Sequence, residues 1–191
     1  MSSNRLPRIC KAKIIQGRTL RFRDAIEDDA KFILTLRTDS QKSRYLSATD
    51  SDIGQQKAWL NNYVNLTDQA YFIIEDFESR PLGTVRLYDA QGKSFCWGSW
   101  ILKEGAPQSA AIESALMVYS YAIEHLGFSA AHFDVRIANE SVWRFHERFG
   151  AKRIAVDELN YLYKIDADNL LRACNKYKKY LPEKVRVTGV F

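Results

Sequence analysis

The sequence predicts a mixed α/β fold built on one mostly antiparallel sheet with helices on both faces. The segment from Trp97 to Gly127 joins a short apolar run to a long amphipathic stretch through a loop of small residues, which is typical of a strand followed by a helix. The apolar runs before it are separated by short turns and are expected to pair antiparallel. The two strands that flank the long helix are expected to be parallel, because a helical crossover connects them.

Hydrophobic periodicity and turn residues assign the remaining elements. Residues 1 to about 17 are expected to be a flexible or edge extension, and residues 39–52 a polar loop. Alternating or continuous apolar runs predict strands at residues 19–23, 70–77, 82–89, 94–103, 131–137, 151–157 and 160–165, with a last edge strand in the tail VRVTGVF. Apolar residues at helical spacing predict helices at residues 24–37, 53–66, about 107–127, 141–149 and 166–180.

The helix that ends at Gly127 is central to the prediction of function. Its apolar face repeats at i, i+3, i+4 and i+7, through Ile112, Ala115, Leu116 and Tyr119. Either Pro107 or Ser109 suits its first turn. The first N–H groups of such a helix lack backbone acceptors and face the end of the preceding strand, where they favour an anion.

Composition indicates a globular chain of one domain, with 191 residues, 46% of them hydrophobic and 27% charged. No apolar run approaches the roughly 18–20 residues that span a bilayer, and the basic N-terminal segment lacks the apolar region of a signal peptide. Cys10, Cys96 and Cys174 are too few and too scattered for a disulfide framework, which favours a reducing cytoplasm. No Cys/His spacing indicates a metal site.

The net charge of +5 suits an anionic small molecule such as a nucleotide or CoA, and no nucleic-acid partner is expected. A solvated basic surface would give the same charge. A basic cluster near the C-terminus has the same two interpretations, a solvated face or a site for a second anion such as a nucleotide diphosphate. This cluster consists of Lys176, Lys178, Lys179, Lys184 and Arg186.

Two motifs resemble the GCN5-related N-acetyltransferase (GNAT) family. The run QSAAIE from Gln108 is similar to the family loop Gln/Arg-x-x-Gly-x-Gly/Ala, with Ala111 at the first glycine position. Glu113 departs from this loop, because its carboxylate would repel a pyrophosphate unless it points away. The run NESVWRFHERFGA from Asn139 looks like the family's Asn-x-x-Ala/Ser-x-x-Leu-Tyr-x-x-x-Gly-Phe.

The resemblance covers about residues 19–165. Residues 1–18 then form an N-terminal extension, and residues 166–191 form a basic helix and tail packed on the same domain. The implied fold is a GNAT-like sheet in which the two parallel strands splay apart. An acetyl-CoA donor would lie in the gap between them.

The resemblance also implies where the donor is bound. The pantetheine arm and pyrophosphate would contact Ile101, Leu102, Lys103, Gln108, Ser109, Ala110, Ala111, Ile112, Asn139 and Phe145. His146 takes the position of a tyrosine that protonates the departing thiolate in many members, and a histidine can supply either a proton or a hydrogen bond. From the residues alone, Asn139 is equally a helix N-cap, Phe145 a core residue and His146 a structural histidine.

Four residues are candidate contacts for the acceptor, namely Tyr45, Trp97, His132 and Asp134. His132 and Asp134 alternate with apolar residues on a strand that helices are expected to cover on both faces, so they need polar partners. They form either a buried hydrogen-bonded set or a charged wall near the acceptor amine. Trp97 is either a pocket residue or a core residue.

The resemblance therefore implies an acetyl-CoA-dependent N-acetyltransferase, in which a neutral amine attacks the thioester directly and backbone N–H groups polarise its carbonyl. The sequence looks most like the members that acetylate amino sugars carried on nucleotides. The alternatives are an acetyltransferase for protein N-termini or another small amine, and a GNAT-shaped binding module that has lost catalysis. A homodimer is left open.

Overall fold

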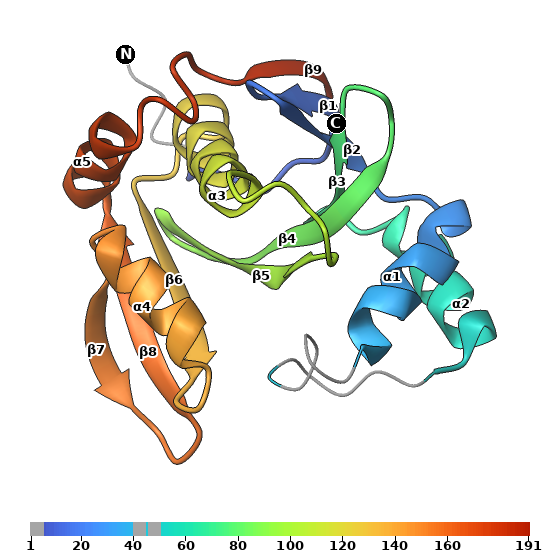
Figure 1. The fold of residues 1–191 in the computed structure, drawn as a ribbon, viewed down its shortest axis with the longest axis horizontal. Coiled ribbons are helices and arrows are strands. Elements are labelled where there is room, and N and C mark those ends of the chain that lie inside the picture. The colour runs from blue at the N-terminus through green and yellow to red at the C-terminus, as the bar shows by residue number, and fades with distance from the viewer. Residues whose placement is uncertain (1–5, 40–44, 46–50) are drawn as a thin grey trace.

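The computed structural model describes residues 6–39, 45 and 51–191. Its strands are β1 (Ala12–Gln16), β2 (Leu20–Asp24), β3 (Ala70–Asp76), β4 (Pro81–Gln91), β5 (Ser94–Leu102), β6 (Ala130–Arg136), β7 (Lys152–Val156), β8 (Asn160–Asp166) and β9 (Arg186–Val190). Its helices are α1 (Ala30–Thr38), α2 (Ile53–Tyr63), α3 (Ala110–Ser120), α4 (Glu140–Arg148) and α5 (Ala167–Lys176). A single sheet in the order β7-β8-β6-β5-β4-β3-β2-β1-β9 contains these strands (Figure 1).

The predicted mixed α/β fold is confirmed, but several elements differ in their bounds. The helix predicted to reach Gly127 is an α-helix only to Ser120 and continues as a π-helical segment, Tyr121–His125, and α2 ends at Tyr63 instead of residue 66. Part of the expected N-terminal extension forms β1, which pairs with both β2 and β9 because Ala12 and Ile15 are fully buried in the core. The first helix begins only at Ala30, since Leu20–Asp24 completes a strand. The last helix ends at Lys176 instead of residue 180. Most of the expected loop at 39–52 lies outside the described residues.

Two hydrophobic clusters lie on opposite faces of the sheet. Strand β3 separates them, because Phe72 and Ile74 point into the larger cluster while Tyr71 and Ile73 point into the smaller one. The larger cluster packs α3, α4 and α5 on one face, and the smaller packs α1 and α2 on the other. Figure 1 shows α1 and α2 at the end of the molecule opposite α4 and β6–β8. Among the described residues, no helix has both the length and the apolar character needed to cross a bilayer.

The parallel pair β5 and β6 separates soon after it forms. Their pairing covers only Ser94–Cys96 on β5 and Ala130–His132 on β6. Strand β5 continues beside β4 up to Leu102, whereas β6 turns toward β8, with which it pairs along its whole length. The predicted splay is therefore present, and α3 begins just beyond the open end of β5.

Glu113 joins the first turns of α3 to the start of β2. Its carboxylate is almost fully buried and accepts hydrogen bonds from Thr19 N at 2.6 Å, Thr19 Oγ1 at 2.6 Å and Leu20 N at 3.0 Å. The same carboxylate lies so close to Gly17 that a Cβ atom there would come within 3.0 Å of it. Glu113 therefore points into the fold, and its departure from the family loop has a structural cause.

Replacing Glu113 with alanine should destabilise the fold. The change leaves the buried N–H group of Leu20 and the part-buried N–H group of Thr19 without their acceptor, so we expect the free energy of unfolding to fall by about 2–4 kcal/mol. Chemical denaturation monitored by circular dichroism measures this loss. Glu104→Ala, at an exposed position before α3, should change it by no more than about 0.5 kcal/mol. Equal stability of the two variants would contradict a stabilising role for the hydrogen bonds that Glu113 accepts from Thr19 and Leu20.

Candidate active site

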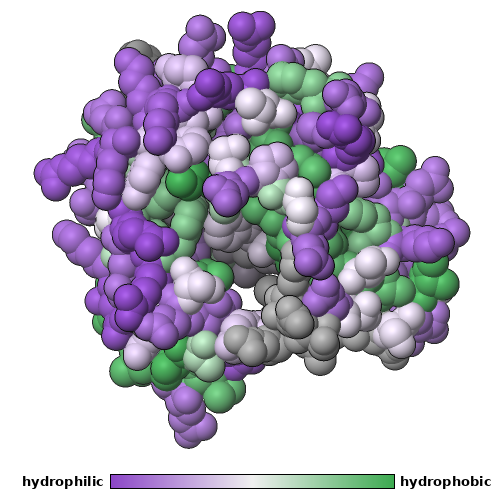
Figure 2. All heavy atoms as spheres, viewed as in Figure 1, coloured by the Kyte–Doolittle hydropathy of each residue, from purple (hydrophilic) through white to green (hydrophobic). Residues whose placement is uncertain are grey.

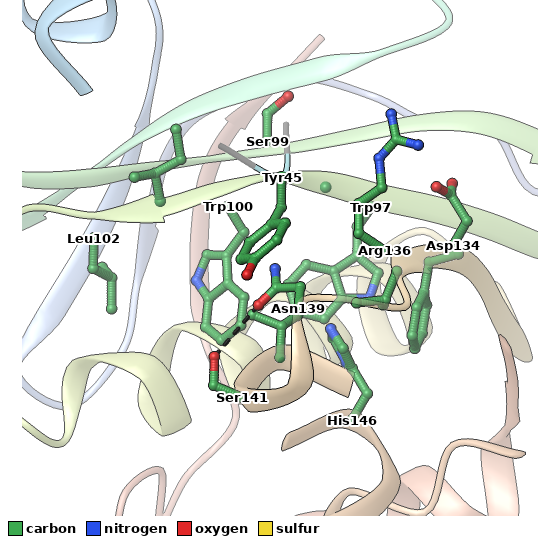
Figure 3. A pocket seen from close by; sticks show the side chains of 15 residues that line it. Tyr45, Trp97, Ser99, Trp100, Leu102, Asp134, Arg136, Asn139, Ser141 and His146 are labelled. Atoms are coloured by element: carbon green, nitrogen blue, oxygen red, sulfur yellow. Dashed lines mark hydrogen bonds between the residues drawn. The ribbon is translucent and has the colours of Figure 1, made fainter. Parts of the chain in front are cut away.

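A cavity of about 400 Å³ lies where β5 and β6 separate. Its walls come from the second half of β5, the end of β6 and the first turns of α4, as Figure 3 shows. The lining residues are Tyr45, Trp97, Gly98, Ser99, Trp100, Ile101, Leu102, Phe133, Asp134, Val135, Arg136, Asn139, Ser141, Val142 and His146. A space-filling view shows an opening on this face between the β6–β8 side and the α1–α2 side (Figure 2).

A bulge in β5 shapes one wall of the cavity. Thr84 of β4 is paired with Ile101 and Arg86 with Gly98, so β5 carries one extra residue opposite Val85. Within this bulge, Ser99 has a φ of +47°, which is uncommon for a residue other than glycine. The hydroxyl of Thr84 fixes this conformation by donating to Ser99 O at 2.8 Å. A bulge of this kind turns backbone groups away from the sheet ladder and toward the cavity.

The cavity reaches both faces of the sheet. On β6, Phe133 and Val135 point into the core beneath α3 to α5, whereas Asp134 is exposed on the opposite face. The expectation that helices cover this strand on both faces is wrong, because α1 and α2 pack on residues of β3 and leave β6 uncovered. Among the described residues, Asp134 is therefore exposed on that face.

His146 is a buried and neutral part of the cavity wall. Its ring centroid lies 4.3 Å from that of Phe133, 5.3 Å from Trp97 and 5.6 Å from Phe145. This burial lowers the pKa of His146 to about 3, because the apolar surroundings disfavour the imidazolium. Its Nδ1 atom has no hydrogen-bond partner within the described residues. His146 therefore has hydrogen-bonding capacity that the fold leaves unused.

Two tryptophans connect the cavity to α3. Trp97 is buried and its Nε1 donates to Tyr119 Oη at 3.2 Å, so it is both a core and a pocket residue. Trp100 Nε1 donates to Ser114 Oγ at 3.1 Å, and that hydroxyl donates to Ala111 O at 3.2 Å. The indole of Trp100 thereby holds the first turn of α3 next to the bulge.

The start of α3 has the features of an anion site. Ser109 occupies the N-cap position, but its side chain makes no capping hydrogen bond. Ala111 and Ile112 stand in the first turn, whose N–H groups have no acceptors inside the helix. Gln108 is exposed just before the helix. The expected pyrophosphate residues, Gln108 to Ile112, thus lie together beyond the open end of β5.

Asn139 precedes α4, but its side chain does not cap this helix. The side chain of this N-cap residue makes no capping hydrogen bond, and its Oδ1 accepts from Ser141 Oγ at 3.4 Å (Figure 3). Asn139 therefore occupies the expected N-cap position, where its carbonyl accepts from Val142 N and Trp143 N at 3.2 Å, but its side chain does not cap the helix. Asn139 also lines the cavity, opposite the bulge of β5.

Besides the residues at the start of α3, three predicted site residues, His132, Phe145 and Lys103, also lie outside the lining of this cavity. His132 is at the paired end of β5 and β6, where Ser94 Oγ lies 2.8 Å from its Nδ1 and Asp89 Oδ2 lies 3.2 Å from its Nε2. Phe145 packs between Trp100 and Phe149 and serves the core. Lys103 continues the β5 ladder by donating to Leu82 O at 2.8 Å.

Sequence reasoning missed several cavity residues, among them Gly98 and Ser99. It could not assign them to a bulge, because a one-residue insertion in a strand leaves no pattern in a single sequence. Trp100, expected as a pocket or core residue, and Arg136, expected in the polar stripe with His132 and Asp134, both line the cavity. The basic C-terminal cluster is fully exposed and is not part of this cavity. Across the described part of the chain, no three His, Cys, Asp or Glu side chains gather as a metal site requires.

Comparisons with known proteins agree with this geometry. A family model described as an acetyltransferase (GNAT) domain matches residues 19–152. Among solved structures, the chain is similar to FdhC, described as a nucleotide-linked sugar GNAT, with 38% identity and a TM-score of 0.79 over 88% of this chain and 98% of that chain. No curated protein matches it.

Two further solved structures share the fold at lower identity. A GCN5-related N-acetyltransferase from Brucella melitensis is 18% identical, with a TM-score of 0.77 over 92% of this chain and 89% of that one. A spermidine N-acetyltransferase from Vibrio cholerae, solved with CoA and spermine, is 16% identical, with a TM-score of 0.71 over 80% and 98%. The splayed sheet, the matched domain and the 38% identity lead to one conclusion: the chain belongs to the GNAT family of acetyltransferases.

Proposed function

We propose that this acetyltransferase transfers the acetyl group of acetyl-CoA to the amine of a nucleotide-linked sugar. The cavity at the parting of β5 and β6 is the observation that carries the proposal, because it gives a thioester and an amine access from opposite faces. The similarity to FdhC, which is described as a nucleotide-linked sugar GNAT, favours this acceptor. A cytoplasmic location fits both substrates.

In the proposed complex, the donor lies along the edge of β5 that β6 has left. Ile101 and Leu102 contact the pantetheine arm from β5, and Asn139 contacts it from α4. The pyrophosphate lies on the N–H groups at the start of α3, between Gln108 and Ile112, where the helix dipole favours negative charge. The bulge at Ser99 directs a backbone N–H group toward the thioester carbonyl and stabilises its developing charge.

The acceptor enters from the face that carries Asp134. The carboxylate of Asp134 attracts the acceptor ammonium, and Tyr45 contacts the sugar, while Trp97 closes the cavity from the core face. The ammonium first releases a proton to solvent, and the neutral amine attacks the carbonyl carbon, so a C–N bond forms as the C–S bond breaks. CoA leaves as a thiolate, and the proton that the amide nitrogen releases is taken up by this thiolate through solvent. His146 donates a hydrogen bond to the departing sulfur. With a pKa of about 3, it does so as a neutral imidazole, which makes it a hydrogen-bond donor and excludes it as an imidazolium acid near pH 7.

Acetyl-CoA should stabilise the protein through the amides at the start of α3. At 100 times Kd, ligand binding adds about 2.7 kcal/mol, which corresponds to a rise in Tm of about 5–10 °C for a chain of this size. Ala111→Asp places a carboxylate at this anion site, so the rise should shrink, while the helix dipole keeps the free variant folded. Ala111→Asn is the uncharged control. Differential scanning fluorimetry measures the rise in Tm that acetyl-CoA causes in each variant. An equal rise in Ala111→Asp and Ala111→Asn would mean that the pyrophosphate binds elsewhere.

His146→Phe keeps the aromatic packing and removes the N–H donor. We expect kcat to fall by about 10²-fold, as for loss of one donor to a developing charge, with a much smaller change in acetyl-CoA affinity. His146→Gln retains an N–H donor and should recover part of the rate. In the unchanged protein, kcat should not fall as pH rises through 6.5, because His146 is already neutral there. If kcat does fall as pH rises through 6.5, and His146→Phe abolishes that fall, His146 acts as an imidazolium acid instead.

A panel of amines tests the acceptor. With acetyl-CoA as donor and thiol release as the readout, kcat/KM for amino-sugar nucleotides should exceed that for peptides with free N-termini and for spermidine by about 10²-fold or more. A preference for peptides or for spermidine would contradict the sugar assignment. Absence of thiol release with every amine, despite acetyl-CoA binding, would favour a GNAT-shaped binding module.

A further inference from the structure

A polar stripe on β4 borders the acceptor side of the cavity. Thr84 and Arg86 alternate with the buried residues Val85 and Leu87 and therefore face away from the core beneath α3, whereas the partly buried Tyr88 also packs against the edge of that core. Arg86 is paired with Tyr71 on β3, which belongs to the cluster packed by α1 and α2, and with Gly98 on β5, which lines the cavity. Arg86 thus stands one strand away from the cavity, on the face from which the acceptor enters.

The guanidinium of Arg86 is half-buried beside aromatic rings. Its Cζ atom lies 5.0 Å from the ring centroid of Tyr88 and 5.4 Å from that of Trp59. Its Nε atom is buried without a hydrogen-bond partner, and no ion pair joins Arg86 to a carboxylate within the described residues. Desolvation lowers the pKa of Arg86. A half-buried cation whose Nε atom has no partner carries an energetic cost that a bound anion would offset.

A second arginine approaches the same region from α1. Arg37 Nη1 donates to the hydroxyl of Ser99, in the bulge, at 3.4 Å. The positive charge of Arg37 also lowers the pKa of Arg86. The groups that raise this pKa are Tyr88, Tyr71 and Asp68. Two guanidinium groups therefore flank the bulge on the acceptor side. Guanidinium groups bind phosphate oxygens in a bidentate manner, and together they repel a polycation.

We propose that Arg86, with Arg37 beside it, binds a phosphate group of the acceptor. This inference rests on the proposed function, because it identifies which part of a nucleotide-linked sugar the β4 face recognises. It also separates the two phosphate sites of the enzyme. The donor pyrophosphate lies at the start of α3, and the acceptor phosphate lies on the opposite face of the sheet, beside Trp59 and Tyr88.

The kinetic test compares matched acceptors with and without phosphate. The specificity ratio is kcat/KM for an amino-sugar nucleotide divided by kcat/KM for the free amino sugar, measured with saturating acetyl-CoA. Arg86→Met should lower this ratio by about 10–100-fold, mainly through the KM of the phosphorylated acceptor, and Arg86→Lys should recover part of it. Arg172→Met, at an exposed position on α5, is the control and should leave the ratio unchanged. A ratio that is equal in all variants would overturn the inference.

A binding test separates this inference from the proposed function. Titration calorimetry with UDP as the probe, in the presence of saturating CoA to fill the donor site, should detect binding that weakens at least tenfold in Arg86→Met and weakens with added salt. If UDP binding requires Arg86 but no amine is acetylated, the proposed acetyltransferase function is rejected and the phosphate site at Arg86 is supported. Acetylation of amines with UDP binding that ignores Arg86 would reject the phosphate site alone. Arg37→Gln supplies the same comparison should Arg86→Met fail to fold.

Discussion

The parting of two parallel strands after three paired residues is the constraint on which this structure depends. Backbone N–H and C=O groups inside a protein must be paired, so a strand edge left open in the middle of a sheet needs another partner or contact with water. Here β5 loses β6 after Cys96 but keeps β4 on its other side up to Leu102. The unpaired edge is what makes room for an extended ligand in the middle of the sheet.

The rest of the fold holds that open edge in place. Strand β6 can leave β5 because β8 pairs with it along its whole length. Trp100 fixes the bulge to the first turn of α3 through Ser114, and Glu113 fixes the same helix to the start of β2. Each contact joins elements that are distant in sequence, and all of them meet where α3 begins. The amides at the start of α3 and the bulge at Ser99 are therefore held in one rigid arrangement, as preorganised stabilisation of charge requires.

The distribution of charge follows from the same topology. On the core face, His146 is kept neutral by the aromatic residues Trp97, Phe133 and Phe145, which suits a site where a sulfur leaves. On the other face, α1 and α2 cover β3 but leave β6 open, so charged side chains collect there. Asp134 and Arg86 stand on either side of β5, and in the proposed complex they give this face one group suited to an ammonium and one suited to a phosphate.

The sequence by itself determined the element order, the parallel pair around the long helix and the family, because these depend on local periodicity and on short motifs. It also predicted Asn139 and His146 as site residues from their offset along one helix, and both line the cavity. Only the tertiary structure decided that Glu113 points into the fold, that His132 sits at the closed end of the strand pair and that β5 carries a bulge at Ser99. These features depend on strand register and on contacts between distant segments, and such contacts leave no periodic signal in a single sequence.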